Sequence, residues 1–285
     1  MGSTLSLRRL VGPPAPKQVW MVDTPAQLTA GTAQDSQVTS AANLASMGKF
    51  SLNEFGRSKL PSRAIFCAGV YLPGRKDVVR RSFQSWERIR GTWIRYSFAR
   101  HAGKEYVVLF GVYGAAMALE ALQLLRDGEV RSAFFVGSMY AKKLPVGAIF
   151  IPTEIEDRAG IVPIDDPRAS YATPDKTILA LTRAELKKRK VTYSEGRISS
   201  VPAVLHGIEH VHDSVRLDRS IMGQEMEGST FLHFTKKHGI RSGALLYVSD
   251  NERHSIISGA KGVREARRRA LKNIARVAVE VLQSL

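Results

Sequence analysis

Residues 224–251, QEMEGSTFLHFTKKHGIRSGALLYVSDN, contain the pattern that decides the fold. Their first half predicts an amphipathic helix that opens with Glu225 and the Met-Glu pair after it, and that stops at Gly239 after a basic last turn. Their second half predicts a buried strand over 244–248 that ends in a polar Ser-Asp pair. Because α/β proteins keep their chemistry at strand ends, both polar clusters are candidate site residues.

The rest of the chain alternates strand and helix patterns, which predicts an α/β fold. Apolar runs over 64–72, 106–114 and 132–140 predict strands, and the Ala/Leu-rich run over 115–128 predicts a helix. A last amphipathic helix is predicted over 263–285, with a row of basic side chains facing solvent. These are Arg264, Arg267, Arg268 and Lys272.

The 285 residues accommodate one large domain, which we place at 61–285, and an extension before it. Residues 1–60 are rich in Ser, Thr, Ala, Gln and Gly without sustained periodicity, so we expect a largely irregular segment. Its start, MGSTLSLRRLVG, carries arginine and no acid, and resembles a mitochondrial transit peptide. If the segment is retained, its length suits wrapping over a partner. The predicted location is mitochondrial, with the cytoplasm as the alternative.

The chain is strongly basic, with 42 Lys+Arg against 26 Asp+Glu, a net charge of +16 and a pI near 10.2. Such a charge favours a polyanionic neighbour such as RNA. The segment over 75–100 interleaves arginines with aromatic residues, which suits phosphate contact and base stacking. The alternative is a solvated charged face with the aromatic rings turned inward. The nucleic-acid candidates are Arg80, Arg81, Arg88, Trp93 and Arg95.

Several classes of feature are excluded by the sequence. It has no run of about 18 apolar residues that could cross a membrane. Its single cysteine, Cys67, rules out an internal disulfide and lies in an apolar run, which predicts a core residue. The His/Glu-rich stretch over 206–213 lacks regular helical spacing, so we interpret it as a polar loop and predict neither a metal nor a cofactor.

The pattern of Met-Glu, small residues, a helix, a glycine, an apolar strand and Ser-Asp resembles the purine nucleoside phosphorylase/uridine phosphorylase superfamily, which also contains nucleosidases. The resemblance implies a three-layer α/β/α fold with a twisted mixed central sheet, and homo-oligomers. It implies that Met226 and Glu227 hold a ribose, since a carboxylate accepts hydrogen bonds from sugar hydroxyls. It also implies that Asp250, with Ser249 beside it, protonates the leaving base, which requires a raised carboxyl pKa.

The same resemblance implies a phosphate site at the ends of the first and third strands, with phosphate as a co-substrate. Pro-Gly-Arg at 73–75 and Gly-Ser at 137–138 match the family pattern. Tyr71 and Leu72 stand where the family has Gly-Asp, and Phe135 stands where phosphorylases have an arginine that nucleosidases also lack. The candidate phosphate residues are Arg75, Arg90, Gly137 and Ser138.

Two functions are consistent with these residues. The first is cleavage of the N-glycosidic bond of a nucleoside or related ribosyl compound by phosphate or by water. Phe135 and Tyr71, which replace the family's arginine and glycine, favour hydrolysis or a weak phosphorolysis. The second is a catalytically silent family member that serves as an RNA-binding structural or assembly subunit of a mitochondrial ribonucleoprotein. The net charge, the Arg/aromatic segment over 75–100, the extension and the altered catalytic positions support the second, and a fold alone does not fix a function. The presence of both Glu227 and Asp250 favours the first.

Overall fold

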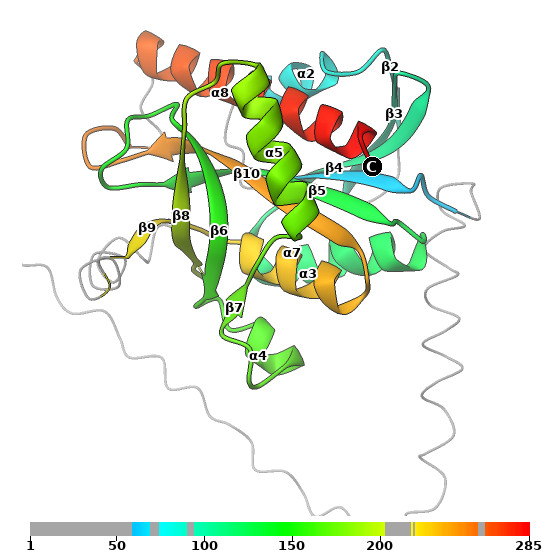
Figure 1. The fold of residues 1–285 in the computed structure, drawn as a ribbon, viewed down its shortest axis with the longest axis horizontal. Coiled ribbons are helices and arrows are strands. Elements are labelled where there is room, and N and C mark those ends of the chain that lie inside the picture. The colour runs from blue at the N-terminus through cyan, green and yellow to red at the C-terminus, as the bar shows by residue number, and fades with distance from the viewer. Residues whose placement is uncertain (1–58, 69–73, 90–93, 203–217, 219, 256–259) are drawn as a thin grey trace, which may run out of the picture. The chain divides into compact units, whose positions relative to one another are not determined.

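A computed structural model describes residues 59–68, 74–89, 94–202, 218, 220–255 and 260–285 of the chain (Figure 1). Several predictions of the sequence lie outside these residues. They concern the extension up to residue 58, the substitutions Tyr71 and Leu72, the candidates Arg90 and Trp93, and the loop over 206–213.

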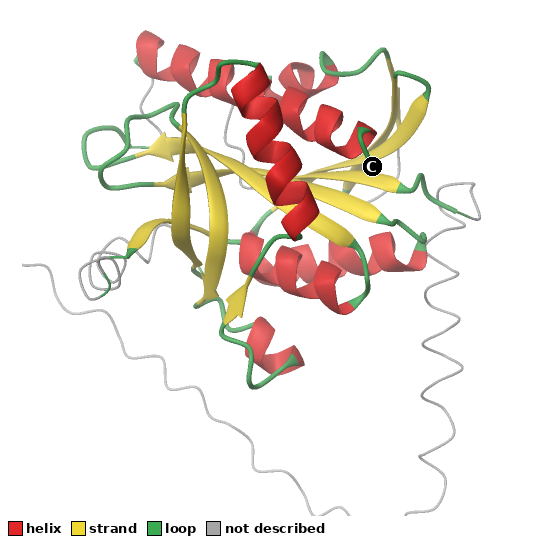
Figure 2. Cartoon of the chain, in the orientation of Figure 1, coloured by secondary structure: helices red, strands yellow, loops and turns green. Residues whose placement is uncertain are grey.

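The described residues form a 10-stranded sheet with helices on both of its faces (Figures 1 and 2). The strands are β1 (Arg63–Ala68), β2 (Ser85–Arg88), β3 (Arg95–His101), β4 (Lys104–Val112), β5 (Ser132–Tyr140), β6 (Ile149–Asp157), β7 (Tyr171–Ala172), β8 (Tyr193–Ser200), β9 (Ile221–Glu225) and β10 (Arg241–Asp250). The helices are α2 (Arg75–Arg80), α3 (Gly114–Asp127), α4 (Val162–Asp165), α5 (Lys176–Lys188), α7 (Gly228–Lys237) and α8 (Lys261–Gln283).

Helices α2, α5 and α8 pack on one face of the sheet, and α3 and α7 pack on the other (Figure 2). Alternate residues of a strand point to opposite faces. In β10, Leu245 and Tyr247 therefore belong to the core under α8, whereas Ala244, Leu246 and Val248 belong to the core under α7. The sheet contains parallel and antiparallel pairs, so the predicted three-layer fold with a mixed central sheet is confirmed.

Four parallel strands deliver their carboxyl ends to one edge of the sheet. β1 pairs in parallel with β4 and β5, and β10 pairs in parallel with β5. The residues at this edge are Ala68, Val112, Tyr140 and Asp250. The polar end of β10 therefore lies beside the turn that follows β4 and the end of β5, where an α/β protein is expected to keep its site.

Five of the strands pair with one another to form a closed ring. β10 pairs with β5 and β6, β6 pairs with β8, β8 pairs with β9, and β9 meets the end of β5 through Gln224 and Tyr140. This closure corrects one boundary. Glu225, which the sequence places at the opening of a helix, is the last residue of β9 because it pairs with Ser200 of β8, and α7 begins only at Gly228.

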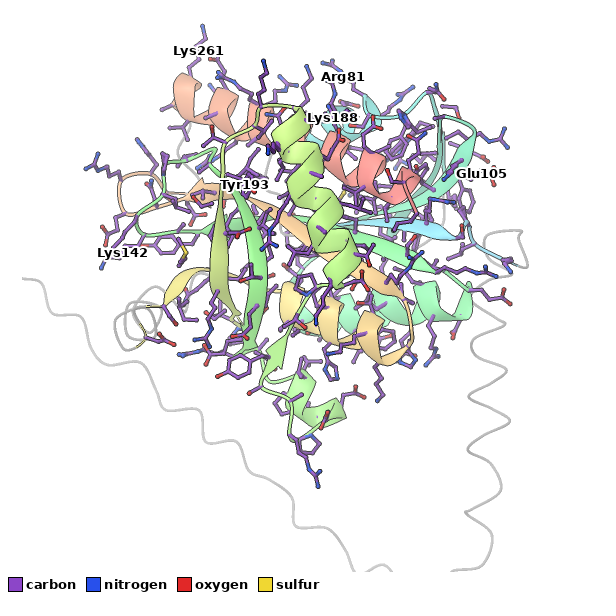
Figure 3. All side chains as sticks on the ribbon, viewed as in Figure 1. Arg81, Glu105, Lys142, Lys188, Tyr193 and Lys261 are labelled. Atoms are coloured by element: carbon purple, nitrogen blue, oxygen red, sulfur yellow. The ribbon has the colours of Figure 1, made fainter. Side chains whose placement is uncertain are left out.

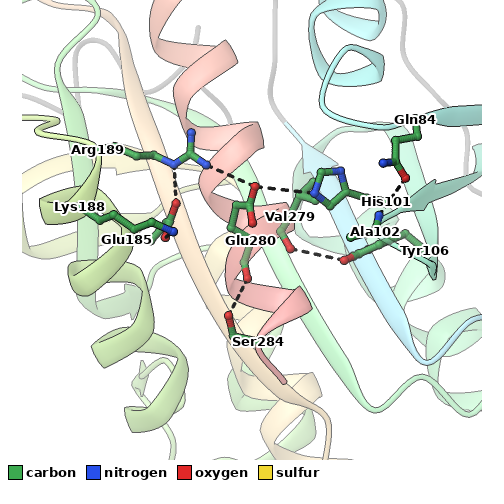
Figure 4. Close-up of polar contacts among 10 residues, drawn as sticks. All are labelled: Gln84, His101, Ala102, Tyr106, Glu185, Lys188, Arg189, Val279, Glu280 and Ser284. Carbon is green, nitrogen blue, oxygen red and sulfur yellow. Dashed lines mark hydrogen bonds and ion pairs between the residues drawn. The ribbon is translucent and has the colours of Figure 1, made fainter.

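The C-terminal part of α8 is fixed by Glu280 (Figure 4). Arg189, which follows α5, donates from Nη2 to Glu280 Oε1 at 3.4 Å, and its Nε donates to Glu185 at 2.5 Å. His101 at the end of β3 lies 3.7 Å from the same Glu280 oxygen. Glu280 therefore joins α8 to α5 and to β3, which holds the helix in place over the sheet.

Substitution of Gly223 by alanine is expected to destabilise the fold. A Cβ at this position would lie 2.1 Å from Met139 Cε and 2.4 Å from the carbonyl oxygen of Tyr140, and the backbone oxygen cannot move without opening the ring of strands. We expect a loss of about 1–3 kcal/mol in the free energy of unfolding, measured by urea denaturation. The control is Gly262→Ala in α8, where nothing lies within 4 Å of the added carbon, and which is expected to be neutral or stabilising. Equal stability of both variants would contradict the described packing.

Candidate functional site

An acidic pair, Glu225 and Glu227, lies at the N-terminus of α7 with both side chains buried. Glu225 Oε2 accepts the amide hydrogens of Glu227 at 2.7 Å and of Gly228 at 2.6 Å, and Ser200 Oγ donates to its Oε1. Its carboxylate thus satisfies amides that the first turn of a helix leaves without partners. Glu227 accepts the amide hydrogen of Gly114, at the start of α3, at 2.7 Å, and the backbone of Met226 is a further hydrogen-bond partner.

The two carboxyl groups differ in how well their charged forms are stabilised. Burial raises the pKa of Glu225, and hydrogen bonds from Ser200 and from the amides of Glu227 and Gly228 oppose the rise. For Glu227, burial and then the negative charge of Glu225 raise the pKa to about 8, and backbone hydrogen bonds from Gly114 and Met226 oppose the rise. Of the two, Glu225 therefore has the better stabilised negative charge, and Glu227, with its pKa raised to about 8, has the stronger tendency to hold a proton.

This assignment predicts how stability depends on pH. The pKa of Glu227 is raised from 4.5 to about 8 on folding, so the folded chain binds a proton that the unfolded chain releases. Its contribution to stability is full below about pH 4.5 and is lost as pH rises through 8. As pH rises from about 4.5 to above 8, the free energy of unfolding of Glu227→Gln should therefore fall by a few kcal/mol less than that of the parent. Urea denaturation across the pH range measures this difference. Parallel pH profiles for parent and variant would contradict a buried, protonated Glu227.

Met226 and Gly114 bring the acidic pair against the turn between β4 and α3. A Cβ on Gly114 would lie 3.8 Å from Met226 Cε, so the half-buried methionine side chain covers this turn. Gly114 has φ 78°, a left-handed conformation that glycine adopts without strain, and in it the amide hydrogen points to Glu227. The predicted ribose residues Met226 and Glu227 therefore lie together, next to a glycine turn.

The Ser-Asp pair lies at a bulge at the end of β10. The register against β5 shifts by one residue just before Asp250, which leaves Ser249 as the extra residue, and such bulges re-aim side chains beside functional sites. The Ser249 hydroxyl donates to Asp250 Oδ1 and lies 3.1 Å from the carbonyl oxygen of Met139. Burial raises the pKa of Asp250, and the Ser249 hydrogen bond and the positive charge of Arg267 oppose the rise. The pKa direction is the one that a general acid requires.

Tyr140 connects the two acidic clusters. It is the last residue of β5, and it pairs with Asp250 of β10 and with Gln224 of β9. Burial raises the pKa of its phenol, and the negative charges of Glu252 and Asp250 raise it further. No local pattern indicates that Tyr140 joins the two clusters, because the sequence shows only a tyrosine at the end of an apolar run.

Arg267 corrects a prediction of the sequence. The helical pattern of the C-terminal segment places Arg267 on the solvent face, but its side chain is only 3% exposed. Its Nε donates to the carbonyl oxygen of Ser249 at 2.6 Å, and its Nη2 donates to that of Ser255 at 2.8 Å. The guanidinium can be buried because backbone carbonyls at the end of β10 accept its hydrogen bonds. Helix α8 is thereby tied to the Ser-Asp pair.

Arg267→Met is expected to lower both stability and any activity that depends on Asp250. Methionine keeps an apolar stem but leaves the carbonyl oxygens of Ser249 and Ser255 without their donor, at a cost of about 1–3 kcal/mol in the free energy of unfolding. Thermal unfolding would measure the loss. Arg268→Met is the matched control, since Arg268 is the exposed neighbour on the same helix. The same melting temperature for both variants would show that the buried contacts of Arg267 contribute nothing.

The phosphate candidates Arg75 and Ser138 lie near each other but already have partners. Arg75, the first residue of α2, donates from Nη1 to the hydroxyl of Tyr113 at 2.6 Å, and its guanidinium lies 5.6 Å from that ring's centroid. Ser138 pairs with Tyr247 across β5 and β10, and the charge of Arg75 acts on the Tyr247 phenol. Tyr113 directly precedes Gly114, so Arg75 lies close to the turn that contacts Glu227.

Phe135 occupies the position where the family resemblance implies an arginine in phosphorylases. Its ring is fully buried and lies 5.9 Å from the ring centroid of Phe66 and 5.5 Å from that of Phe231. A Cβ on Gly137 would lie 2.8 Å from the Phe135 ring, which gives Gly137 a packing reason beside its predicted phosphate role. On the side of β5 that α3 and α7 cover, Phe135 is therefore part of an aromatic core and supplies no cation that could bind phosphate.

The nucleic-acid candidates divide into exposed arginines and inward rings. The side chains of Arg80, Arg81, Arg88 and Arg95 are exposed. The aromatic residues between them face the core: Tyr96 and Phe98 are buried, and Trp86 is half-buried against Phe83 and Phe110. The described part of this segment therefore offers charges for phosphate contact but presents no fully exposed ring for base stacking.

The structure thus gathers Met226, Glu227, Ser249, Asp250 and Arg75 around the carboxyl ends of the strands. Sequence reasoning missed the partners that hold them, because Tyr113, Tyr140 and Arg267 reach the site from distant segments. An open pocket of about 580 Å³ lies elsewhere, at the end of α5, and contains none of the predicted site residues. No helix among the described residues has the length and apolar character needed to span a bilayer.

Comparisons with known proteins agree with this geometry. A family model described as the Phosphorylase superfamily matches residues 73–283. Among solved structures, uridine phosphorylase from Vibrio fischeri ES114 is 17% identical over 79% of this chain and 93% of its own, with a TM-score of 0.67. The 5′-methylthioadenosine/S-adenosyl homocysteine nucleosidase of Campylobacter jejuni is 14% identical over 78% and 99%, with a TM-score of 0.66.

The corresponding nucleosidase of Neisseria meningitidis, solved with methylthio-immucillin-A, is 18% identical over 79% of this chain and 100% of its own, with a TM-score of 0.65. Identities at this level show a shared fold. The search of curated proteins found no match. With a family model that covers most of the chain and a site at the expected strand ends, the chain belongs to the Phosphorylase superfamily.

Proposed function

We propose that the protein binds the ribose of a nucleoside or related ribosyl compound and cleaves its N-glycosidic bond. The observation that supports this is the placement of two acids with raised pKa values, Glu227 and Asp250, at strand ends that meet at Tyr140. Acids whose pKa values are raised by burial are typical of general acid and substrate-binding groups.

In this proposal each acid has a separate role. Glu227 accepts hydrogen bonds from the ribose hydroxyls, and Met226 packs against the sugar. Because Glu227 is 1% exposed and Met226 Cε lies over Gly114, the methionine side chain must move aside for the sugar to enter. Asp250 donates its proton to the leaving base while Ser249 orients the carboxyl, so the base departs as a neutral molecule and positive charge develops on the ribose.

Water is the proposed nucleophile: its oxygen bonds to the anomeric carbon as the bond to the base breaks, and the proton that it loses passes to solvent. The resemblance implies a phosphate-binding arginine at position 135 in phosphorylases. In this chain the position is Phe135, which packs in an aromatic core. Arg75, the predicted anion ligand, has its Nη1 hydrogen bonded to Tyr113. Among the described candidates, a phosphate site would therefore depend on Arg75, Gly137 and Ser138, of which only Arg75 is a cation, and this favours hydrolysis over phosphorolysis.

The test is release of free base from purified protein incubated with purine and pyrimidine nucleosides, followed by chromatography with and without phosphate. Equal release in both conditions is expected. Release only with phosphate would contradict the proposed nucleophile and make phosphate a co-substrate. Absence of release from every substrate would contradict the proposed reaction.

A second candidate function is that of a catalytically silent family member recruited as a subunit of a ribonucleoprotein. The observation that favours it is the closed state of the site, in which Glu227 is buried and its acceptor atom is used by Gly114. This candidate predicts that nucleosides neither react nor bind, as titration calorimetry would measure. The related proposal of a mitochondrial location is tested by imaging the full chain fused to a fluorescent protein, with and without residues 1–60.

A further inference from the structure

The solvent-exposed side of helix α8 carries a row of cations along the helix axis. Arg264, Arg268, Lys272 and Arg276 recur every four residues, which places successive charges about 6 Å apart along the axis. We call these four residues the α8 row. Like charges four residues apart repel one another and weaken a helix. None of the four forms an ion pair with a described residue, so an anion from outside the described chain would relieve the repulsion.

A second group of cations lies on the neighbouring elements. The pKa of Lys76 in α2 is lowered by burial and then by the positive charges of Arg88, Arg95 and Arg80, with Asp77 acting in the other direction. The positive charges of α2 and of the β2–β3 hairpin therefore act on the same side chain, that of Lys76. We call Lys76, Arg80, Arg88 and Arg95 the α2–hairpin cluster, and these residues too form no ion pair with any residue that the structure describes.

The two groups belong to one face of the molecule. Helices α2 and α8 pack together, and a Cβ on Gly74, just before α2, would lie 3.6 Å from the guanidinium of Arg268. Figure 3 shows Lys261 of α8, Lys188 of α5 and Arg81 after α2 along the same upper side of the view. The exposed acids on α2 and α8 are only Asp77 and Glu265. The face therefore carries a large excess of positive charge.

We propose that this face binds double-helical RNA through its phosphates. The buried side of α8 faces the sheet, so a partner meets only its exposed side, where the cations outnumber the single exposed acid, Glu265. Among the described residues between the arginines, the rings of Tyr96 and Phe98 are buried and that of Trp86 is half-buried, so none of these three is a fully exposed platform for the bases of a single strand. A-form RNA suits a flat strip of cations, because phosphates line both sides of its narrow major groove.

Other anionic partners fit the face less well. The large hydrophobic residues that are exposed in the described chain are Ile164, Tyr171 and Met222, which lie on α4, β7 and β9 and not on α2 or α8. A membrane-binding helix inserts apolar side chains, and a protein interface is centred on apolar or aromatic anchors. The face offers neither, and its contacts are limited to charge. The proposal is independent of the proposed nucleoside cleavage.

The experiment is fluorescence anisotropy of the full chain with a labelled RNA duplex of about 16 base pairs. The row variant is Arg268→Gln/Lys272→Gln/Arg276→Gln. The control is Arg131→Gln/Lys236→Gln/Arg241→Gln, which removes the same charge from exposed positions outside α2, α8 and the hairpin. We expect the row variant to bind the duplex about tenfold or more weakly than the parent does. The slope of log affinity against log salt, measured between about 50 and 200 mM, should become shallower by about 3. The control should keep the parent's slope.

Four results would overturn the proposal. They are the absence of duplex binding at about 50 mM salt, equal losses in the row and control variants, equal or tighter binding of single-stranded RNA or of DNA duplex, and equal or tighter binding to phosphatidylserine vesicles. Circular dichroism and thermal unfolding of both variants establish that they are folded. If the row variant is unfolded, the single variant Lys272→Gln, with an expected slope change of about 1, replaces it.

Discussion

Glu227→Ala is expected to weaken nucleoside binding by about 100-fold or more, because the ribose would lose charge-assisted hydrogen bonds worth about 1.5–3 kcal/mol each. The fold should persist, since Glu225 and not Glu227 accepts the amides that begin α7. Titration calorimetry with a purine and a pyrimidine nucleoside measures the change. The matched control is Glu120→Ala, an exposed glutamate of α3, which should bind as the parent does.

The pH dependence of binding sharpens this test. Glu227 has a pKa raised to about 8 by burial and by the charge of Glu225, so it must release its proton before it can grip hydroxyls as a carboxylate. Affinity should therefore rise up to tenfold per pH unit below about 8 and level off above it. Glu227→Gln should bind weakly with a flat profile. Nucleoside binding that Glu227→Ala leaves unchanged would remove the ribose assignment.

The order of helices and strands was predictable because periodicity and stop signals are local. Gly239, in a left-handed conformation after α7, is the stop that the sequence indicates, and β5 has the predicted bounds 132–140. The closure of β5, β10, β6, β8 and β9 into a ring was not predictable in this way. It depends on contacts such as Gln224 with Tyr140, which are far apart in the chain. The helix-like opening at Glu225 was wrong for the same reason, since pairing with β8 outweighs local propensity.

The site was predictable only as residues that follow strands, and not as a set of partners. Met226 and Glu227 and the Ser-Asp pair stand out by spacing. Their surroundings do not, because Arg267 belongs to a helix whose other arginines face solvent. A buried guanidinium is recognised only from the carbonyl oxygens that accept its hydrogens. Tyr113 beside Arg75 is likewise a tertiary contact that no local pattern reports.

Asp250→Asn is expected to lower kcat for purine nucleosides by about 10²–10⁴-fold with little change in substrate binding. Asparagine preserves the shape and can still accept a hydrogen bond from Ser249, but it cannot transfer a proton to the base. The decisive substrate is a ribosyl compound with a leaving group that departs without protonation, such as 4-nitrophenolate. Ser249→Ala is the control, which should reduce the rate less because the acid remains.

The two substrates separate proton donation from every other effect of the substitution. If Asp250 acts as the acid, the variant loses the purine reaction but keeps cleavage of the nitrophenyl riboside, since ribose binding by Glu227 and attack by water are unaffected. Loss of both reactions in equal measure would instead mean that Asp250 supports the structure at the bulge of β10, where it pairs with Tyr140. Unchanged rates with both substrates would exclude Asp250 from the reaction, and the raised pKa of its carboxyl would then reflect burial alone.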